Sequence, residues 1–445
     1  MSKRFDIHVM VPLYPLMPYF VDRTRELADK FTASHPEYRF RITGADWLSV
    51  PQTVHDAVRK GDAPTVVQYF YTSTRDALDA RRPDGSPLFT SVERAIAGRT
   101  EILGEPVVLG DVSPAARRYY TYDGAVAAMP PLTSTTLLYA NTTLLERAGI
   151  TEVPRTWAGI EAACRAVTAL PDGPAHAITW PNHGWWFQQS VAQQGALLAD
   201  RDNGRTGRPE KVFLDSDAML AYVQWWRGLH RAGLYRYHPS RVNTEVDWDG
   251  NFRAFADQEV AFVLTTSVEA ARMAQAGRDG GFVVEACRMP YNDQVPYAGN
   301  VIGGDALWLA ADLDQATQDG ALAFMQYLNS PRTAAERHRE TGFIPVTDGA
   351  IELLEQEGWF RRNPHFRTAL DQLAANSGSA AARGALLGEF AAIQDILTTA
   401  MHDVLATDVD PRVRFGQANA EAQLLLDRYN DAYRGKGPGG PIRVG

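Results

Sequence analysis

The N-terminal part of the chain alternates apolar runs with amphipathic segments. Residues 6–13 form an apolar run typical of a buried strand, and residues 20–35 place apolar side chains at helical spacing. The same patterns predict a second strand over 38–45, a helix over 51–60 and a third strand at the end of 61–70. This strand–helix–strand alternation predicts a parallel sheet and an α/β fold.

In the rest of the chain, the pattern predicts a segment that passes between two domains and then a mostly helical C-terminal part. Residues 125–141 are apolar, are interrupted by two prolines and then resume as strand, as expected of a segment that passes between two domains. Residues 216–232 form an aromatic-rich helical pattern, and the chain from 312 onward is mostly helical in pattern.

Length and composition describe a large acidic globular protein. At 445 residues the chain exceeds what one hydrophobic core normally serves, so we expect two domains. The formal net charge is −9 and the acids are scattered, which argues against a nucleic-acid partner. The two cysteines, Cys164 and Cys287, provide neither a disulfide framework nor zinc-ligand spacing, and we expect no metal and no cofactor. No run is long enough for a membrane helix.

Two glycines and an acid interrupt an apolar run at "VIGGDALWLA" (301–310). Glycine weakens a strand interior, so Gly303 and Gly304 indicate either a β-bulge or something that comes close to the backbone, often a ligand. Asp305 beside them would accept hydrogen bonds from ligand hydroxyls or pair with a ligand cation. On this interpretation Gly304→Val blocks the ligand without unfolding the protein.

Aromatic residues gather in the middle of the chain. Trp185 is a candidate ligand contact and Trp186 a candidate core residue, because adjacent side chains of a regular element face different ways. His183 is either a polar ligand contact or a surface residue. Trp248, next to Asp247, is either a contact at the rim of a site or part of a helix-capping turn.

Several motifs occur together and in order along nearly the whole chain. They are "LADKFTASHPEYRF", "GDAPTVVQ", "PLTSTTLLYAN", "TWAGIEAACRA", "GGDALWL", "AFMQYLNSPRTAAERHRETGFIPVT" and "EGWFRRNPHFRTALDQL". This ordered set resembles the family-1 extracellular solute-binding proteins of ABC importers. Within that family the chain is most similar to the glycerol-3-phosphate-binding group and more distantly to the maltose-binding group.

The resemblance implies a fold of two α/β lobes, the type II periplasmic-binding-protein-like fold, with the ligand in a cleft between them. It places lobe 1 at residues 1–131 plus 292–332. Lobe 2 is placed at residues 132–291 plus 333–445. It further implies a monomer that closes on a small-molecule ligand and delivers it to ABC permease subunits.

The resemblance also implies a set of cleft residues by matching motif to motif. In the family, serine hydroxyls and glycine amides hold a phosphate, while aromatic side chains and an acid hold the glycerol. The matched positions here are Trp47, Tyr69 to Tyr71, Ser134, Trp185, Ser267, Gly303, Gly304 and Phe343.

This chain departs from the family pattern at three places. Tyr71 stands where the family has its glycerol-binding acid, Leu386 where it has a phosphate-clamping arginine, and Asp305 adds a carboxylate after the glycines. A carboxylate with one negative charge, about 4 Å from one negative charge of a phosphate, gives a repulsion energy of roughly 4 kcal/mol at an effective dielectric of 20. The lost arginine and the added carboxylate disfavour glycerol 3-phosphate, and a sugar, an amino-sugar cation or a glycerophosphodiester fits better. Replacement of the lost arginine by Arg383, which is close by in sequence, stays open.

Two functions remain open at this point. No motif of a hydrolase, metalloprotease, nucleotide-binding or dinucleotide-binding protein occurs, which favours a binding protein without catalysis. The sequence as given starts without a secretion signal. We therefore expect either an extracellular, surface-attached importer component whose signal has been removed, or a cytoplasmic chain that reuses the fold as an enzyme. In that alternative Asp305, His183 or Asp247 would act as acid or base.

Overall fold

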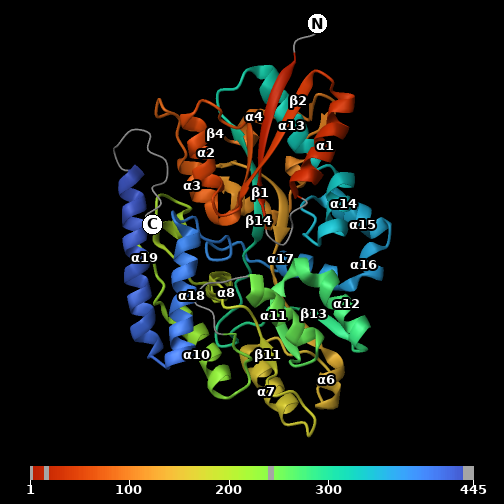
Figure 1. Ribbon diagram of the computed structural model, residues 1–445, viewed down its shortest axis with the longest axis vertical. Helices are drawn as coiled ribbons and strands as arrows, with labels where there is room; N and C mark the ends of the chain where they lie inside the picture. The colour runs from red at the N-terminus through yellow and green to blue at the C-terminus, as the bar shows by residue number, and fades with distance from the viewer. Residues whose placement is uncertain (1–3, 15–19, 239–244, 434–445) are drawn as a thin grey trace.

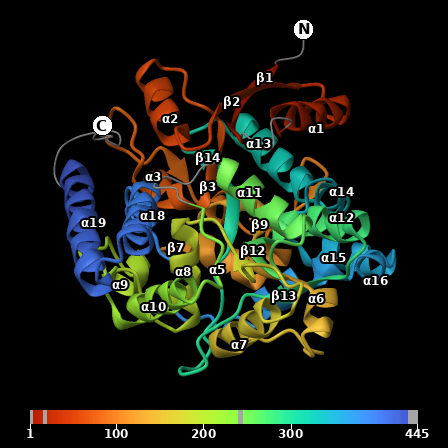
Figure 2. The same ribbon diagram turned by 60° about the horizontal axis from the view of Figure 1, so that its bottom comes forward.

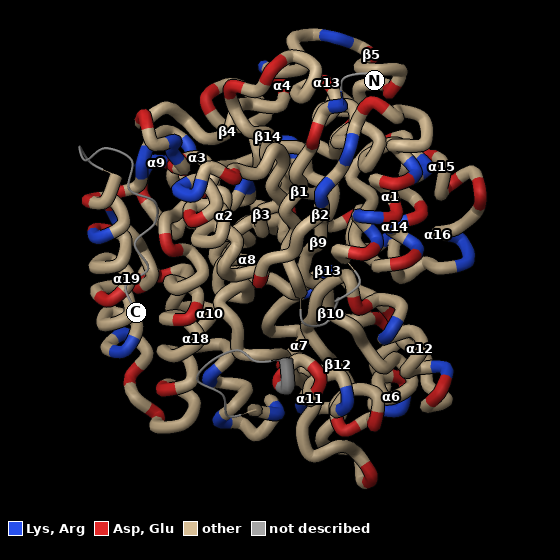
Figure 3. The backbone as a smooth tube through the Cα atoms, turned by 45° about the horizontal axis from the view of Figure 1, so that its top comes forward, with Lys and Arg blue, Asp and Glu red and all other residues tan. Residues whose placement is uncertain are grey.

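The computed structural model describes residues 4–14, 20–238 and 245–433. Two β-sheets lie one above the other along the long axis of the molecule, and helices cover both of them (Figure 1). Charged residues of both signs are interspersed over the outer helices and loops, while the strands at the centre of each sheet carry few (Figure 3). The chain therefore forms the two-lobe α/β fold that the motifs predict.

The first lobe is built on a six-stranded sheet in the order β2-β1-β3-β14-β4, with β9 paired to β14. Strand β1 runs parallel to β2 and β3, as the alternating pattern predicts, and β14 closes the sheet antiparallel to β3 and β9. The strands are β1 (Phe5–Leu13), β2 (Tyr38–Asp46), β3 (Val66–Phe70), β4 (Phe89–Thr90), β9 (Met129–Ser134) and β14 (Gly303–Ala310).

Amphipathic helices cover this sheet. Helix α1 buries Phe20, Leu27, Ala28 and Phe31, which recur at helical spacing, and leaves its charged residues outside. The helices and short hairpins of this lobe are α1 (Phe20–Ser34), α2 (Val50–Arg59), α3 (Thr74–Asp79), α4 (Val92–Ile96), β5 (Glu101–Ile102), β6 (Glu105–Pro106), α5 (Pro114–Tyr120), β7 (Thr121–Tyr122), β8 (Ala125–Val126) and α13 (Gln315–Leu328).

The second lobe is built on a four-stranded sheet in the order β11-β12-β10-β13. Its strands are β10 (Thr136–Asn141), β11 (Ile178–Thr179), β12 (Phe262–Thr266) and β13 (Val284–Arg288). Thr156 caps α7 by accepting a hydrogen bond from the amide of Gly159 at 3.1 Å. The helices are α6 (Thr142–Arg147), α7 (Trp157–Thr168), α8 (Gly184–Gln193), α9 (Asp200–Gly204), α10 (Asp217–Arg231), α11 (Glu245–Ala256) and α12 (Ala270–Gly280).

The C-terminal third is helical, as its pattern predicts. Helices α18 and α19 lie side by side along one flank, where α18 packs on α8 and both contact α10 (Figures 1 and 2). The helices are α14 (Pro331–Thr341), α15 (Asp348–Gln356), α16 (Trp359–Arg362), α17 (Arg367–Ala374), α18 (Phe390–Thr407) and α19 (Pro411–Tyr433).

The segment expected to cross between domains does so. Strand β9 belongs to the first sheet and β10, which follows it directly, belongs to the second. Strand β9 continues to Ser134, past the expected boundary at 131, because it pairs with Gly303 there. The exact lobe boundaries stay a prediction.

Candidate functional site between the two lobes

Four aromatic side chains gather at one edge of the first sheet. Tyr14, Trp47 and Phe70–Tyr71 lie at or just beyond the carboxyl ends of β1, β2 and β3, which are parallel and so end at the same edge. The ring centroids of Tyr14 and Trp47 lie 5.8 Å apart, those of Trp47 and Phe70 5.0 Å, and those of Phe70 and Tyr71 4.7 Å. We call these four residues the first aromatic wall. Carboxyl ends of parallel strands are where α/β folds bind ligands.

A second aromatic group lies at the N-terminus of α8 and on α11. The ring of His183 lies 6.0 Å from that of Trp248, and Trp186 lies 6.0 Å from Trp248 and 5.7 Å from Trp185. We call His183, Trp185, Trp186 and Trp248 the second aromatic wall. Trp186 is fully buried and donates to the carbonyl of Pro181, so it anchors the wall in the core, whereas Trp185 lies at its edge.

Gly303 and Gln394 connect elements of the two lobes. A Cβ atom on Gly303 would lie 2.9 Å from Cζ2 of Trp185 and 2.8 Å from Oγ of Ser134. Gln394 of α18 donates to the hydroxyl of Tyr71 at 2.9 Å and packs against Gly184, the residue before Trp185. Each of these contacts, Trp185 with Gly303, Gly184 with Gln394 and Tyr71 with Gln394, joins residues more than a hundred positions apart in the sequence.

Two buried donors at this place have no partner among the described residues. They are the indole N–H of Trp185 and the hydroxyl of Thr133, one residue before Ser134. Ser267 is buried, and its hydroxyl oxygen accepts from the amide of Thr135 at 3.1 Å. Because buried polar groups are nearly always paired, unpaired donors between two lobes indicate where a polar ligand would bind.

Different parts of the protein come close to the backbone at each of the two glycines. At Gly303 the neighbours are Trp185 and Ser134. At Gly304 φ is +104°, and a Cβ atom would lie 2.3 Å from the carbonyl oxygen of Leu132 on β9. The backbone that requires this glycine is therefore the neighbouring strand, and the expectation that Gly304→Val leaves the fold intact is wrong. A ligand contact at Gly304 stays a prediction.

Asp305 is fully buried behind the first wall. The hydroxyl of Tyr14 donates to its Oδ1 at 2.6 Å, and Nε2 of Gln68 donates to its Oδ2 at 2.6 Å. Burial raises the pKa of Asp305 to about 7, against the lowering effect of these two hydrogen bonds. In the structure the carboxylate positions Tyr14, and a direct ligand contact stays a prediction.

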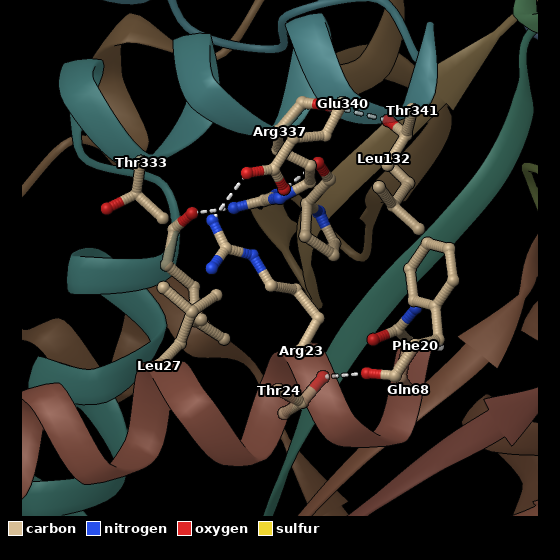
Figure 4. A pocket seen from close by; sticks show the side chains of 12 residues that line it. Phe20, Arg23, Thr24, Leu27, Gln68, Leu132, Thr333, Arg337, Glu340 and Thr341 are labelled. Atoms are coloured by element: carbon tan, nitrogen blue, oxygen red, sulfur yellow. Dashed lines mark hydrogen bonds and ion pairs between the residues drawn. The ribbon is translucent and has the colours of Figure 1, made fainter. Parts of the chain in front are cut away.

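A small pocket lies directly behind Gln68 (Figure 4). Phe20, Leu132 and Gln68 line it on one side, and Arg337 of α14 lines the other. Arg337 donates to the carbonyls of Pro131, at 2.6 Å, and Leu328. It therefore joins the end of α13 to the segment that crosses between the lobes.

His183 caps α8, and a contact of its side chain with a ligand stays a prediction. Its Nδ1 accepts from the amide of Trp185 at 3.0 Å, which requires a neutral ring with the proton on Nε2. Burial lowers the pKa of His183 to about 4, so the ring is neutral at physiological pH. The cap holds the start of α8, and with it Trp185, in place.

Some matched residues lie away from the two walls. Tyr69 faces the opposite side of β3 and packs in the core, with its ring 5.7 Å from Phe89 and 6.4 Å from Trp308. Phe343 packs edge-on to Phe20 at 6.3 Å, beside Leu132.

Arg383 and Asp247 also lie apart from the contact of Trp185 with Gly303. The carbonyl of Arg383 accepts a hydrogen bond from Arg205, and its Nε is buried with no partner in the part of the chain that the structure describes. Asp247 is buried on α11, with an oxygen 3.7 Å from Nδ1 of His238.

Sequence reasoning missed Tyr14 and Gln394. Tyr14 had a usable signal, because it lies at the end of a strand that the pattern predicts. Gln394 had none, since it lies on α18 and reaches Tyr71 across 323 positions of sequence.

Comparisons with known proteins identify the family. The model of the family described as bacterial extracellular solute-binding protein matches residues 26–368. The chain belongs to this family. The sn-glycerol-3-phosphate-binding periplasmic protein UgpB of Yersinia pestis is 24% identical over 414 residues, covering 91% of this chain and 89% of the relative. The resemblance predicted from the motifs is confirmed.

Solved structures of solute-binding proteins share the fold. UgpB from Mycobacterium tuberculosis, in complex with glycerophosphocholine, superposes with a TM-score of 0.72 at 21% identity and covers 96% of this chain and 99% of that one. The sugar-binding protein MalE from Xanthomonas citri gives 0.73 at 17% identity, with coverage of 97% and 100%. These likenesses show the two-lobe fold.

Membrane-spanning helices and metal-ligand clusters are both absent from residues 4–14, 20–238 and 245–433. No helix in these ranges is long and apolar enough to cross a membrane. Nor do three or more histidine, cysteine or acidic side chains in them gather as metal ligands would.

Proposed function

We propose that this solute-binding protein is the substrate-binding component of an ABC importer, and that it closes its lobes on a carbohydrate or a glycerol-derived polar ligand. The observation that carries the proposal is the contact of Trp185, in the second aromatic wall, with Gly303 of the first sheet, beside Ser134. Within the described residues the indole N–H of Trp185 is unpaired, and Gln394 links Tyr71 of the first wall to the start of α8. Aromatic faces pack on the C–H faces of sugars or on a quaternary ammonium group, and the neutral donors bind hydroxyls or a single negative charge.

Glycerol 3-phosphate is the disfavoured member of this class. Leu386 is buried and has no charge to offer a phosphate, and its amide donates to the carbonyl of Asn203. A phosphate monoester dianion relies on charge-assisted contacts of the kind an arginine supplies. Asp305 contributes less repulsion than a free carboxylate, because its pKa is raised to about 7 and Tyr14 and Gln68 cover it.

The relatives support both parts of the ligand class. The M. tuberculosis UgpB was solved with glycerophosphocholine, a diester with one negative charge and a quaternary ammonium group, and MalE is named a sugar-binding protein. The family's description as extracellular supports a place outside the cytoplasmic membrane. We propose ABC permease subunits as the partners. We propose a monomer, with lobe 1 at residues 1–131 plus 292–332 and lobe 2 at 132–291 plus 333–445.

Calorimetry with glycerophosphocholine, maltotriose and glycerol 3-phosphate tests the proposal. We expect one of the first two to bind with a micromolar Kd, and glycerol 3-phosphate to bind at least about tenfold more weakly, a difference of about 1.4 kcal/mol. The proposal is contradicted if glycerol 3-phosphate binds most tightly of the three ligands, or if none of the three ligands binds.

Two matched tryptophan variants locate the ligand. Trp185→Leu should lower the affinity for the ligand by about tenfold, since one aromatic contact contributes roughly 0.5–1.5 kcal/mol beyond its buried area. Trp359→Leu is the control, because Trp359 lies on α16, away from both walls, where its indole N–H contacts His338. Equal loss in both variants would place the ligand elsewhere.

A further inference from the structure

A short segment of the second lobe reaches across to the first lobe. Residues 205–208 follow α9 and lie between β11 and β12 in the chain, and both of these strands belong to the second sheet. Arg208 contacts Asp79 at the end of α3, and Arg205 contacts Tyr119 of α5. Both of these helices belong to the first lobe. We call residues 205–208 the strap.

Arg208 makes two hydrogen bonds to a buried carboxylate. Its Nη1 donates to Oδ2 of Asp79 at 2.9 Å, and its Nη2 donates to Oδ1 at 2.6 Å. The side chain of Asp79 is 1% exposed, whereas that of Arg208 is 23% exposed. Burial raises the pKa of Asp79, but the hydrogen bonds and charges of Arg75 and Arg208 outweigh it and hold the pKa below its usual value. Two opposite charges therefore join the lobes at neutral pH.

Asp79 keeps a partner when the lobes separate. Arg75, on the same helix, donates to both of its carboxylate oxygens, at 2.8 and 2.6 Å. A buried charge that loses its only partner is strongly unfavourable, but here Arg75 neutralises Asp79 whether or not Arg208 is in contact. Arg208 is already partly exposed and would become solvated. The contact between Arg208 and Asp79 can therefore form and break while α3 stays folded.

The other end of the strap also contacts the first lobe. The guanidinium of Arg205 donates to the carbonyl of Tyr119 and lies 4.6 Å from the centroid of the Tyr119 ring. Its Nε donates to the carbonyl of Gly384, in the segment before α18, at 3.0 Å. Between the two arginines, Thr206 and Gly207 line a cavity whose other residues belong to the first lobe. The strap therefore reaches the first lobe at both of its ends.

A strained turn comes directly before the strap. Arg201, Asp202 and Asn203 have φ of 54°, 54° and 62°, the left-handed conformation that residues other than glycine rarely adopt. Oδ1 of Asn203 accepts hydrogen bonds from the amides of Leu198 and Ala199, at 2.8 and 3.1 Å, and so holds the turn. Such strain persists only where the surroundings determine it, and it is common at ligand clamps and switch regions. The turn determines where the strap leaves the second lobe.

Arg208 lies between α3 and α19, on one flank of the molecule. Besides its contact with Asp79 on α3, its Nη1 lies 3.4 Å from Oδ1 of Asn430 on α19. Helices α3 and α19 occupy one flank and α14 the other, with β14 between them (Figures 1 and 2). Arg337 of α14 contacts the segment that crosses between the lobes at Pro131. Because the crossing segment lies toward α14, a hinge motion about it would separate Arg208 from Asp79.

We propose that the strap is a latch between the lobes: the pair of Arg208 and Asp79 stabilises the closed arrangement before any ligand binds. A ligand that binds only the closed form has an apparent affinity proportional to the closed fraction of the free protein, so the latch raises affinity without touching the ligand. Its residues belong to neither aromatic wall. The inference rests on the lobe closure of the proposed function, but not on the identity of the ligand.

Single-molecule energy transfer between dyes on the two lobes tests the latch without ligand. The full-length chain carries dyes at Lys60→Cys, just after α2, and at Gln224→Cys on α10, both at exposed positions. Cys287→Ser prevents labelling there, and Cys164 is buried.

We expect the unliganded chain to show a closed and an open population. Arg208→Gln should lower the closed-to-open ratio by about tenfold or more, because it removes two hydrogen bonds between charged groups. Arg208→Lys keeps the charge but not the two-pronged geometry, so its ratio should lie between the other two. Added salt should lower the ratio of the unmodified strap more than that of Arg208→Gln.

Arg39→Gln is the matched control. Arg39 also makes two hydrogen bonds to an aspartate, Asp6, at 2.6 and 2.9 Å, but both residues are exposed and lie on neighbouring strands of one sheet. Its closed-to-open ratio should equal that of the unmodified chain. No detectable closed population in the unmodified chain, an unchanged ratio in a folded Arg208→Gln variant, or an equal fall in Arg39→Gln overturns the proposal. The ligand calorimetry above tests the proposed function separately, since these populations are measured without ligand.

Discussion

The hydroxyl of Tyr14 lies 2.6 Å from Oδ1 of Asp305, although 291 positions separate the two residues. This contact joins the end of the first strand to the glycine-containing strand β14, and it places a buried carboxyl directly behind an aromatic wall of the candidate site. Asp305 thereby determines where Tyr14 can lie, and its protonation state becomes part of the stability of the site.

The stability of the protein should fall between pH 4 and pH 7 because of Asp305. Its pKa is raised to about 7 in the folded state, so folding favours the protonated form. That contribution is fully present below the unfolded-state pKa near 4 and is lost as the pH rises through 7. Asp305→Asn cannot titrate, so its stability relative to the unmodified protein should rise over this range, by on the order of 3–4 kcal/mol. Urea unfolding of both proteins at pH 4.5 and 8 measures this change in relative stability. A stability difference between the two proteins that does not depend on pH would contradict the prediction.

The titration of His183 should lower the stability of the folded protein as the pH falls, the opposite of the effect of Asp305. Its pKa is lowered to about 4, so folding favours the neutral ring, and its contribution is present above about 6.5 and lost as the pH falls toward 4. His183→Asn keeps a good helix-capping side chain without a titrating group. We expect similar stability to the unmodified protein at pH 7 and a loss on acidification that is smaller by roughly 2–3 kcal/mol. Thermal unfolding of both proteins at pH 7 and 4.5 measures this difference. If both lose the same stability on acidification, His183 is not the cause of the loss.

The two adjacent glycines should respond differently to alanine. At Gly304, positive φ and the carbonyl of Leu132 at 2.3 Å from the new Cβ should cost about 3 kcal/mol of folding stability or more. At Gly303 the new methyl group meets side chains, Ser134 and Trp185, which can shift, so stability should fall less and ligand affinity should fall by about tenfold. Chemical unfolding and calorimetry on both variants separate the two effects. A Gly304→Ala variant as stable as Gly303→Ala would contradict the assignment.

A buried carboxylate joins α3 to the C-terminal helices. Asp79 is 1% exposed and accepts two hydrogen bonds each from Arg75 and Arg208, and one from Tyr429 of α19 at 3.0 Å. Asp79→Asn should cost roughly 3 kcal/mol of unfolding free energy, because it leaves buried cations without their counter-charge.

Asp408 offers a matched control for Asp79. It also lies between two arginines, Arg227 and Arg231, but these ion pairs are at the surface. Solvent screens such pairs, so Asp408→Asn should change stability little. Equal losses in the two variants, measured by urea unfolding, would show that burial of Asp79 does not determine its contribution.

Local patterns in the sequence were sufficient for the fold and for part of the site. The alternation of apolar runs and amphipathic segments predicted β1, α1, β2 and α2, because strand and helix periods depend on neighbouring residues alone. The family resemblance placed Trp47 and Tyr71 in one cleft, and in the structure both lie just beyond the carboxyl ends of parallel strands, β2 and β3. The ordered motifs indicated the family, which the match over residues 26–368 confirms.

The tertiary structure alone decided which side chains face one another. Trp185 lies against Gly303, Gln394 bonds to Tyr71, and Leu132 approaches Gly304, because packing of the lobes and of α18 brings distant segments together. It also placed Tyr69 in the core and turned Asp305 from an expected free carboxylate into a buried one. Burial and hydrogen-bond partners depend on contacts between distant parts of the chain, and a one-dimensional pattern contains the residue types but not those contacts.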